Sequence, residues 1–150
     1  MEFKSHMELA LSEARAAATR GEVPVGAILI APGGQIFAAG NQTRALSDPT
    51  AHAEILAIRA ACAAAGSERL TGYDLYVTLE PCAMCAAAIA AARISRLYYG
   101  ASDPKSGGVA HGARVFSHPQ AHHIPEVYDG IAAAAAESLL KEFFEARRKS

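Results

Sequence analysis

Cysteines are few in this sequence, and long apolar runs are missing. The three cysteines are an odd number, which argues against a disulfide framework and favours metal binding or catalysis. No apolar run approaches the roughly 18 residues that a membrane span needs, and the N-terminus lacks the pattern of a signal peptide. We therefore expect a cytoplasmic protein that does not enter the membrane.

Neither basic nor acidic residues are in excess in this sequence. The chain has 14 Lys and Arg residues against 15 Asp and Glu residues, so its formal net charge is −1 and no global basic field indicates a nucleic-acid partner. Contacts with phosphates would have to come from a local cluster, and the clearest one is Arg147-Arg148-Lys149. The alternative is that this cluster only complements the dipole at the end of a helix.

Length and composition fit a single globular domain over residues 1–150. Of these residues 51% are hydrophobic and 19% charged, which is enough to bury a core. Helical periodicity covers residues 7–20, 51–65, 82–92 and 131–148, with a short helical stretch near 110–117. Apolar or alternating runs predict strands over residues 25–31, 35–40, 74–79, 94–100 and 123–128. We predict an α/β fold, a three-layer α/β/α sandwich with a central mixed sheet of five strands.

Two short motifs carry the chemistry, and each lies where a helix is expected to begin. They are His52-Ala53-Glu54 and Pro81-Cys82-Ala83-Met84-Cys85. A helix N-terminus stabilises thiolates over thiols through its free N–H groups and its dipole. Cys82 and Cys85 are three residues apart, so they lie on one helical face and can bind one ion. The imidazole of His52 would complete a set of three protein ligands for zinc.

A set of three ligands predicts a catalytic metal site. Structural zinc normally has four protein ligands, whereas catalytic zinc keeps one position for water. Cys62 lies ten residues beyond His52 on the same expected helix, about 15 Å along its axis at 1.5 Å per residue. It cannot reach the ion, and we expect it to be a small buried hydrophobe. His111, His122 and His123 remain open as alternative ligands.

Glu54 is expected to handle protons. Residues two apart on a helix do not share a face, so Glu54 is poorly placed to join His52 as a ligand. In the first helical turn it can approach the open side of the ion instead. Zinc lowers the pKa of a bound water towards 7, and a nearby carboxylate can take that proton and return it to a leaving group.

The two motifs are weak signals alone and a strong signal together. A lone C-x-x-C is more often structural or redox-active, and a lone H-x-E is common. Their combination in the order H-x-E … P-C-x-x-C is the established signature of zinc-dependent nucleobase deaminases, which we apply here.

Further segments extend the match along nearly the whole chain. They are residues 22–27, Gly40-Asn41, residues 48–54, residues 75–82, residues 84–86, Gly100-Ala101, Asp103, Lys105, Gly107, Phe143-Phe144 and Arg147-Arg148. With them the chain resembles the cytidine deaminase superfamily and, within it, the bacterial tRNA-specific adenosine deaminases. The resemblance implies a cytidine deaminase-like fold. Gln42 departs from the pattern, because a basic residue is expected there.

The resemblance implies a homodimer that converts adenosine to inosine at the wobble position of the tRNA anticodon. One Zn²⁺ per chain would be held by His52, Cys82 and Cys85, with Glu54 as the proton shuttle. Asn41 would hydrogen-bond the flipped nucleotide. The other implied contacts form a pocket (Glu22, Val23, Pro24, Ala53, Leu79), touch the flanking nucleotides (Asp103, Lys105) and grip the anticodon loop (Phe144, Arg147, Arg148).

Structural interpretations stand beside several of these roles. Val23 and Pro24 can simply open a strand, Leu79 suits a core, and Asn41 suits a turn. Phe143 and Phe144 are adjacent on a helix, so one can pack while the other serves RNA. Glu80 lies beside the metal-binding motif, and its only role can be to support the backbone there.

Three other functions compete with the tRNA enzyme. A deaminase of a small free substrate (guanine, cytosine or a nucleoside) would use the same zinc site, but has less need of a basic, aromatic C-terminal helix. A zinc-stabilised RNA-binding module without catalysis predicts four metal ligands and no need for Glu54. A C-x-x-C thiol oxidoreductase would require a thioredoxin-like βαβ context, which the pattern lacks.

Overall fold

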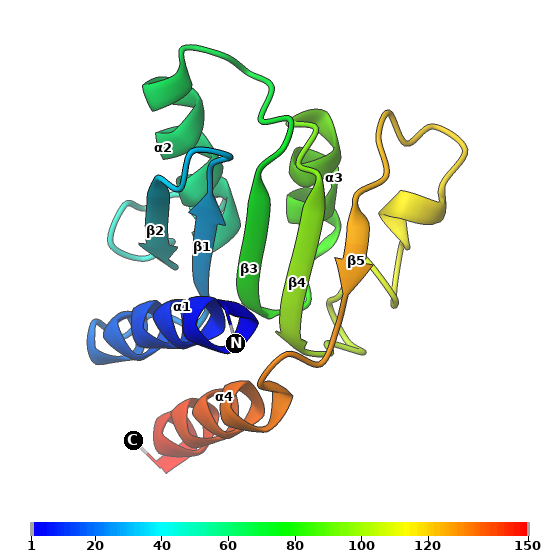
Figure 1. Cartoon of the computed structure of the whole chain (residues 1–150). Helices are drawn as coiled ribbons and strands as arrows, with labels where there is room; N and C mark the ends of the chain where they lie inside the picture. Colours follow the sequence, from blue (N-terminus) through cyan, green and yellow to red (C-terminus); the bar gives the residue numbers. More distant parts are fainter. Residues whose placement is uncertain (1, 150) are drawn as a thin grey trace.

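A mixed sheet of five strands forms the middle layer, in the order β2-β1-β3-β4-β5 (Figure 1). The computed structural model describes residues 2–149, and the side chains of residues 6–148. The strands are β1 (Gly26–Ile30), β2 (Ile36–Gly40), β3 (Asp74–Leu79), β4 (Arg96–Ala101) and β5 (Glu126–Tyr128). The helices are α1 (Glu2–Thr19), α2 (Ala53–Ala65), α3 (Ala83–Ala91) and α4 (Ala133–Lys149), with a 3₁₀ turn, η1, at Val115–Ser117.

Helices cover both faces of the sheet. On one face α2 and α3 pack their alanines and Ile89 against a large apolar cluster that includes Leu75 and Leu97. On the other face α1 and α4 pack around Ile28 and Tyr76, and Figure 1 shows these two helices side by side. The predicted three-layer sandwich is therefore confirmed.

The strand directions place one edge of the sheet where a ligand site is expected. β1 is antiparallel to both β2 and β3, whereas β3, β4 and β5 are parallel. Leu79 at the end of β3 pairs with Ala101 at the end of β4. The residues that follow β3 and β4 therefore meet at the same edge, and ligands of parallel strands bind outside their carboxyl ends.

The element ends differ most from the predicted ones at the start of α1, which begins at Glu2 and not at residue 7, and after β4. The predicted helical stretch over residues 110–117 is reduced to η1, because Gly112 and Arg114 have left-handed backbone angles, with φ of 58° and 44°, that interrupt a right-handed helix. The predicted strand over residues 123–128 shortens to β5, since Pro125 has no N–H to donate. Among the described residues, no helix combines the length and apolarity needed to cross a bilayer.

The close approach of α1 to β1 requires glycine at position 26. A Cβ there would lie 2.6 Å from the backbone nitrogen of Ala14 in α1. We expect Gly26→Ala to lower the free energy of unfolding by about 1–3 kcal/mol through overpacking, measured by urea unfolding. Gly33→Ala is the control, because nothing lies within 4 Å of its Cβ position, and its effect should stay within about 0.5 kcal/mol. Equal effects would contradict the packing argument.

Candidate metal centre and substrate pocket

The starts of two helices position the metal-binding motifs. His52 and Cys82 are the N-cap residues of α2 and α3, both with extended backbone, and Cys85 follows in the first turn of α3. Upstream of His52, the Asp48 carboxylate accepts hydrogen bonds from the N–H and hydroxyl of Thr50 at 2.9 and 2.7 Å. This tight turn directs the chain into α2, so that His52 faces the two sulfurs.

The three side chains form a cluster with the dimensions of a zinc site. Their candidate ligand atoms all lie within 4.8 Å of one another. Nδ1 of His52 is 3.7 Å from Sγ of Cys82 and 3.4 Å from Sγ of Cys85. A tetrahedral zinc ion at about 2.3 Å from sulfur and about 2.0 Å from nitrogen requires roughly 3.5 Å between those two atoms. One nitrogen and two sulfurs at these separations fit the ion.

The electrostatics of the cluster favour a thiolate. Hydrogen bonds with Cys85 and His52 lower the pKa of Cys82 to about 4. The hydrogen bond with Cys82, together with burial, raises the pKa of Cys85. The thiolate is the form that binds metals, so Cys82 is ready for an ion and Cys85 would ionise as the ion binds.

The competing histidines and the third cysteine stay outside this cluster. His111 lies 2.8 Å from the Glu80 carboxylate, and His123 contacts the carbonyl oxygen of Ile94 at 2.8 Å. Cys62 lies in the last part of α2 and packs against the apolar cluster, but it is only partly buried and not the buried residue that the sequence predicts. Within the described part of the chain, the cluster holds no fourth Cys, His, Asp or Glu ligand. A zinc ion there would keep a position for water.

Glu54 borders the open side of the cluster. Its side chain is buried, with 3% of the residue exposed, and burial raises the pKa of its carboxyl to about 7. Together with His52 and Cys82 it lines an inner pocket of about 230 Å³. A carboxyl group with this pKa can both accept and donate a proton near neutral pH.

Asn41 also lines the inner pocket, and its side chain is held in place. It is buried after the end of β2, and its Oδ1 accepts a hydrogen bond from the Ala53 N–H at 2.8 Å. That bond occupies the side-chain oxygen, so the amide NH₂ is the group left for a ligand.

An outer groove of about 710 Å³ adjoins the inner pocket. The two hollows share the lining residues Val23, Leu79, Asp103 and Ser106. The rest of the groove comes from the loop after β4 and from α4, through Ser102, Lys105, Leu140, Phe144, Arg147 and Arg148. Phe144 is 47% exposed, and the Arg147 guanidinium lies over the neighbouring Phe143 ring at 5.3 Å. The side chain of Lys149 lies outside the described residues.

Most of the substrate-binding residues implied by the resemblance line these two hollows, and three of them do not. Glu22, Pro24 and Ala53 are buried beside the pocket. The Glu22 carboxylate accepts hydrogen bonds from the N–H groups of Arg44 and Ala45 at 3.1 and 2.8 Å. Burial alone would raise the pKa of Glu22, but these bonds keep it below its usual value. Glu22 thus fixes the loop after β2, which carries Thr43 into the pocket.

Sequence reasoning missed six lining residues, namely Val25, Thr43, Glu80, Ser102, Ser106 and Leu140. Leu140 had a usable signal, because it precedes Phe144 by four residues and so shares its face of α4. The serines and Thr43 belong to loops, where no periodicity predicts direction.

Comparison with known proteins agrees with this geometry. Residues 1–101 match the model of the cytidine and deoxycytidylate deaminase zinc-binding region. The chain is 60% identical to a tRNA-specific adenosine deaminase of Agrobacterium fabrum, over 95% of this chain and 93% of that protein. It is 44% identical to the enzyme of the same name from Rickettsia typhi, over 96% of this chain and 99% of that protein.

Solved structures give the same result. A chain from structural studies of A-to-I editing by tRNA:A34 deaminases superposes with a TM-score of 0.88 at 59% identity, covering 91% of this chain and 99% of that one. A guanine deaminase from Nitrosomonas europaea shares the fold, with a TM-score of 0.80 at 24% identity over 93% of this chain and 83% of that one. The chain therefore belongs to the zinc-binding cytidine and deoxycytidylate deaminase family and, within it, to the tRNA-specific adenosine deaminases.

Proposed function

We propose that this chain is a zinc-dependent hydrolase that converts adenosine to inosine at the wobble position of a tRNA anticodon. One Zn²⁺ per chain is held by His52, Cys82 and Cys85. The observation that carries the proposal is the continuity of the site. Two of the three candidate ligands line a pocket together with Glu54, and that pocket shares four lining residues with an aromatic and basic groove.

The residues of the inner pocket divide the reaction between them. When bound, zinc supplies a Lewis acid that lowers the pKa of a water molecule towards 7. Glu54 accepts a proton from the attacking water and passes it to the base, so that water replaces the amino group and ammonia leaves. Asn41 donates a hydrogen bond from its amide to the nucleotide. Val23 and Leu79 shape the entrance and exclude bulk water.

The size of the inner pocket fits one extruded base. A base inside a stack cannot reach a metal at the bottom of a pocket, so the nucleotide has to flip out. Flipping costs least in a loop that is already single-stranded, such as an anticodon loop. The groove of about 710 Å³ then takes the flanking nucleotides.

The groove offers the contacts that single-stranded RNA needs. Phe144 presents an exposed ring on which a base can stack. Lys105, Arg147 and Arg148 line the same groove and supply local positive charge in a chain whose net charge is −1. A deaminase of small free substrates has no need of this arrangement.

Turnover on matched substrates tests the proposal. The purified protein would be incubated with a tRNA that carries adenosine at the wobble position and, separately, with free guanine, cytosine, cytidine and adenosine, with ammonia and inosine as readouts. We expect one inosine per tRNA and no turnover of the free compounds. Turnover confined to a free base or nucleoside would replace the tRNA substrate by the small-substrate alternative.

Phe144 should contribute to RNA affinity without acting on the chemistry. Base stacking on an aromatic side chain is worth about 1–3 kcal/mol, so Phe144→Ala should raise KM for an anticodon hairpin by roughly 5- to 150-fold and leave kcat nearly unchanged. Tyr128→Ala is a matched control, because Tyr128 is 44% exposed and lies outside the groove. If both variants raised KM equally, the groove would not be the RNA path.

Two further expectations stay predictions. We propose a homodimer, which sedimentation equilibrium would detect as twice the chain mass of 15.6 kDa. We also expect the protein in the cytoplasm, where its tRNA substrate is found.

A further inference from the structure

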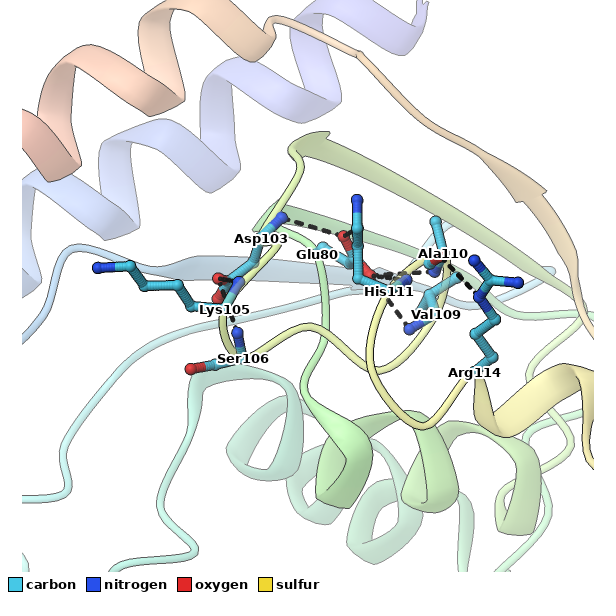
Figure 2. Close-up of polar contacts among 8 residues, drawn as sticks. All are labelled: Glu80, Asp103, Lys105, Ser106, Val109, Ala110, His111 and Arg114. Carbon is cyan, nitrogen blue, oxygen red and sulfur yellow. Dashed lines mark hydrogen bonds and ion pairs between the residues drawn. The ribbon is translucent and has the colours of Figure 1, made fainter.

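Glu80 carries a buried carboxylate that the proposed chemistry does not use. It follows β3 and precedes the metal motif, and only 2% of the residue is exposed. An unpaired buried carboxylate would be strongly destabilising, so its partners identify its task. Figure 2 shows that these partners all come from the β4–η1 loop, residues 102–114.

Both oxygens of this carboxylate are occupied by the β4–η1 loop. Oε2 accepts hydrogen bonds from three consecutive backbone N–H groups, those of Val109, Ala110 and His111, at 3.2, 3.0 and 3.1 Å. Oε1 accepts the N–H of Asp103 at 3.0 Å and lies 2.8 Å from Nδ1 of His111. Hydrogen bonds to a charged acceptor are about twice as strong as neutral ones. The two ends of the loop are thereby tied to one side chain.

The loop also fits closely against Glu80 and the start of α3. A Cβ at Gly107 would lie 2.5 Å from Oε2 of Glu80, and a Cβ at Gly108 would lie 2.5 Å from the backbone nitrogen of Ala83. The Gly108 N–H donates to the carbonyl oxygen of Pro81 at 2.8 Å. The loop therefore has one docked position relative to the metal motif.

Hydrogen bonds continue from Glu80 outward to the groove. The N–H of Asp103 donates to Glu80. Oδ1 of the same Asp103 accepts hydrogen bonds from the N–H groups of Lys105 and Ser106 at 3.2 and 3.0 Å. Asp103 and Ser106 line both hollows, and Lys105 lines the groove. Any shift of the loop at Glu80 would move this wall of the groove.

We infer that Glu80 is a positioning residue for RNA: its carboxylate sets the β4–η1 loop in register with the metal centre, so that the nucleotides beside the target base dock while that base enters the inner pocket. This inference rests on the proposed function. Glu80 also lines the inner pocket, but it is not one of the three candidate metal ligands, and both of its carboxylate oxygens are held by the loop. It acts on substrate affinity through Asp103, Lys105 and Ser106.

Glu80→Gln should release one end of the loop selectively. The glutamine amide has a single oxygen. When this oxygen takes the place of Oε2, it still accepts the three N–H groups of residues 109–111. Its NH₂ would then face the Asp103 N–H, and two donors cannot pair. The Asp103 end is therefore freed while residues 109–111 stay bound. His111→Ala is the matched control, because it removes the ring contact and leaves all the backbone hydrogen bonds to Glu80 in place.

The experiment measures kcat, KM, zinc content and backbone amide exchange for the full chain. For Glu80→Gln we expect KM for a wobble-adenosine hairpin to rise about 10-fold or more, with kcat within threefold of wild type and one zinc per chain. Exchange at the amide of Asp103 should accelerate. His111→Ala should change KM by less than threefold. Gly107→Ala should give the same rise in KM, because its methyl group displaces the loop while Glu80 is unchanged. This variant replaces Glu80→Gln in the test if Glu80→Gln does not fold.

Two results would overturn the inference. A loss of zinc with a fall in kcat at unchanged KM would show that Glu80 supports the metal ligands and not the RNA loop. Wild-type KM and wild-type exchange at Asp103 would show that the loop does not depend on Glu80. Failure of the proposed function gives a different result, since the wild-type protein would then not deaminate the hairpin, while amide exchange and zinc content would still report on the loop.

Discussion

Glu54→Gln is expected to keep one zinc per chain and to lower kcat for deamination by about 10²- to 10⁴-fold, the usual contribution of a general acid–base group. The amide has nearly the same shape as the carboxylate but cannot take a proton from water and return it to the base. Metal content should not change, because Glu54 stands outside the set of one nitrogen and two sulfurs. The measurement is single-turnover inosine formation with zinc quantified in the same sample.

Glu137→Gln provides the control for Glu54→Gln, since Glu137 is exposed on α4 and lines neither hollow. It should keep wild-type turnover. A Glu54→Gln protein that deaminated at the wild-type rate would exclude Glu54 as the proton shuttle, and one that lost its zinc would assign it to the metal instead.

Cys85→Ala should eliminate zinc binding and all measurable turnover. Cys85 is fully buried in the first turn of α3, at 3.4 Å from Nδ1 of His52, and its replacement by alanine removes one of the two sulfur ligands. Cys62→Ala changes the same residue type on α2 and should keep both zinc and activity. Zinc content by elemental analysis and inosine formation are the two readouts. Equal zinc loss in the two variants would contradict the proposed ligand set.

Stability should follow the metal in the same experiment. A ligand at 1,000 times its Kd stabilises the folded state by about 4 kcal/mol, which corresponds to roughly 10 °C in Tm for a chain of this size. A chelator should therefore lower the Tm of the wild-type protein and of Cys62→Ala, and leave that of Cys85→Ala unchanged. A chelator-insensitive wild-type protein would mean that no ion contributes to the fold.

Local signals explain why the metal motifs could be predicted. His52 and Cys82 each precede an apolar helix, and a helix start has a recognisable chemistry of caps, prolines and turns. The alternation of strand and helix then places both starts at the same edge of the sheet. The rise per residue of a helix was enough to predict that Cys62 cannot reach the ion, and Cys62 does lie outside the cluster.

The roles of the buried carboxylates could not be predicted in this way. Glu22 and Glu80 each bind backbone N–H groups that lie more than twenty positions away in the sequence. Periodicity says that such a residue is near a strand end, but not which loop will fold over it. For the same reason the sequence suggested a pocket contact for Glu22, whose carboxylate binds the loop after β2. It suggested backbone support for Glu80, but not which loop Glu80 would bind.

X-ray absorption at the zinc edge of the protein as isolated tests the central claim most directly. We predict two sulfur ligands at about 2.3 Å and two nitrogen or oxygen ligands at about 2.0–2.1 Å, one of them exchangeable water. The spectrum should be the same for Cys62→Ala. A third sulfur, a fourth protein ligand in place of water, or no zinc in freshly isolated protein would contradict a catalytic metal at His52, Cys82 and Cys85.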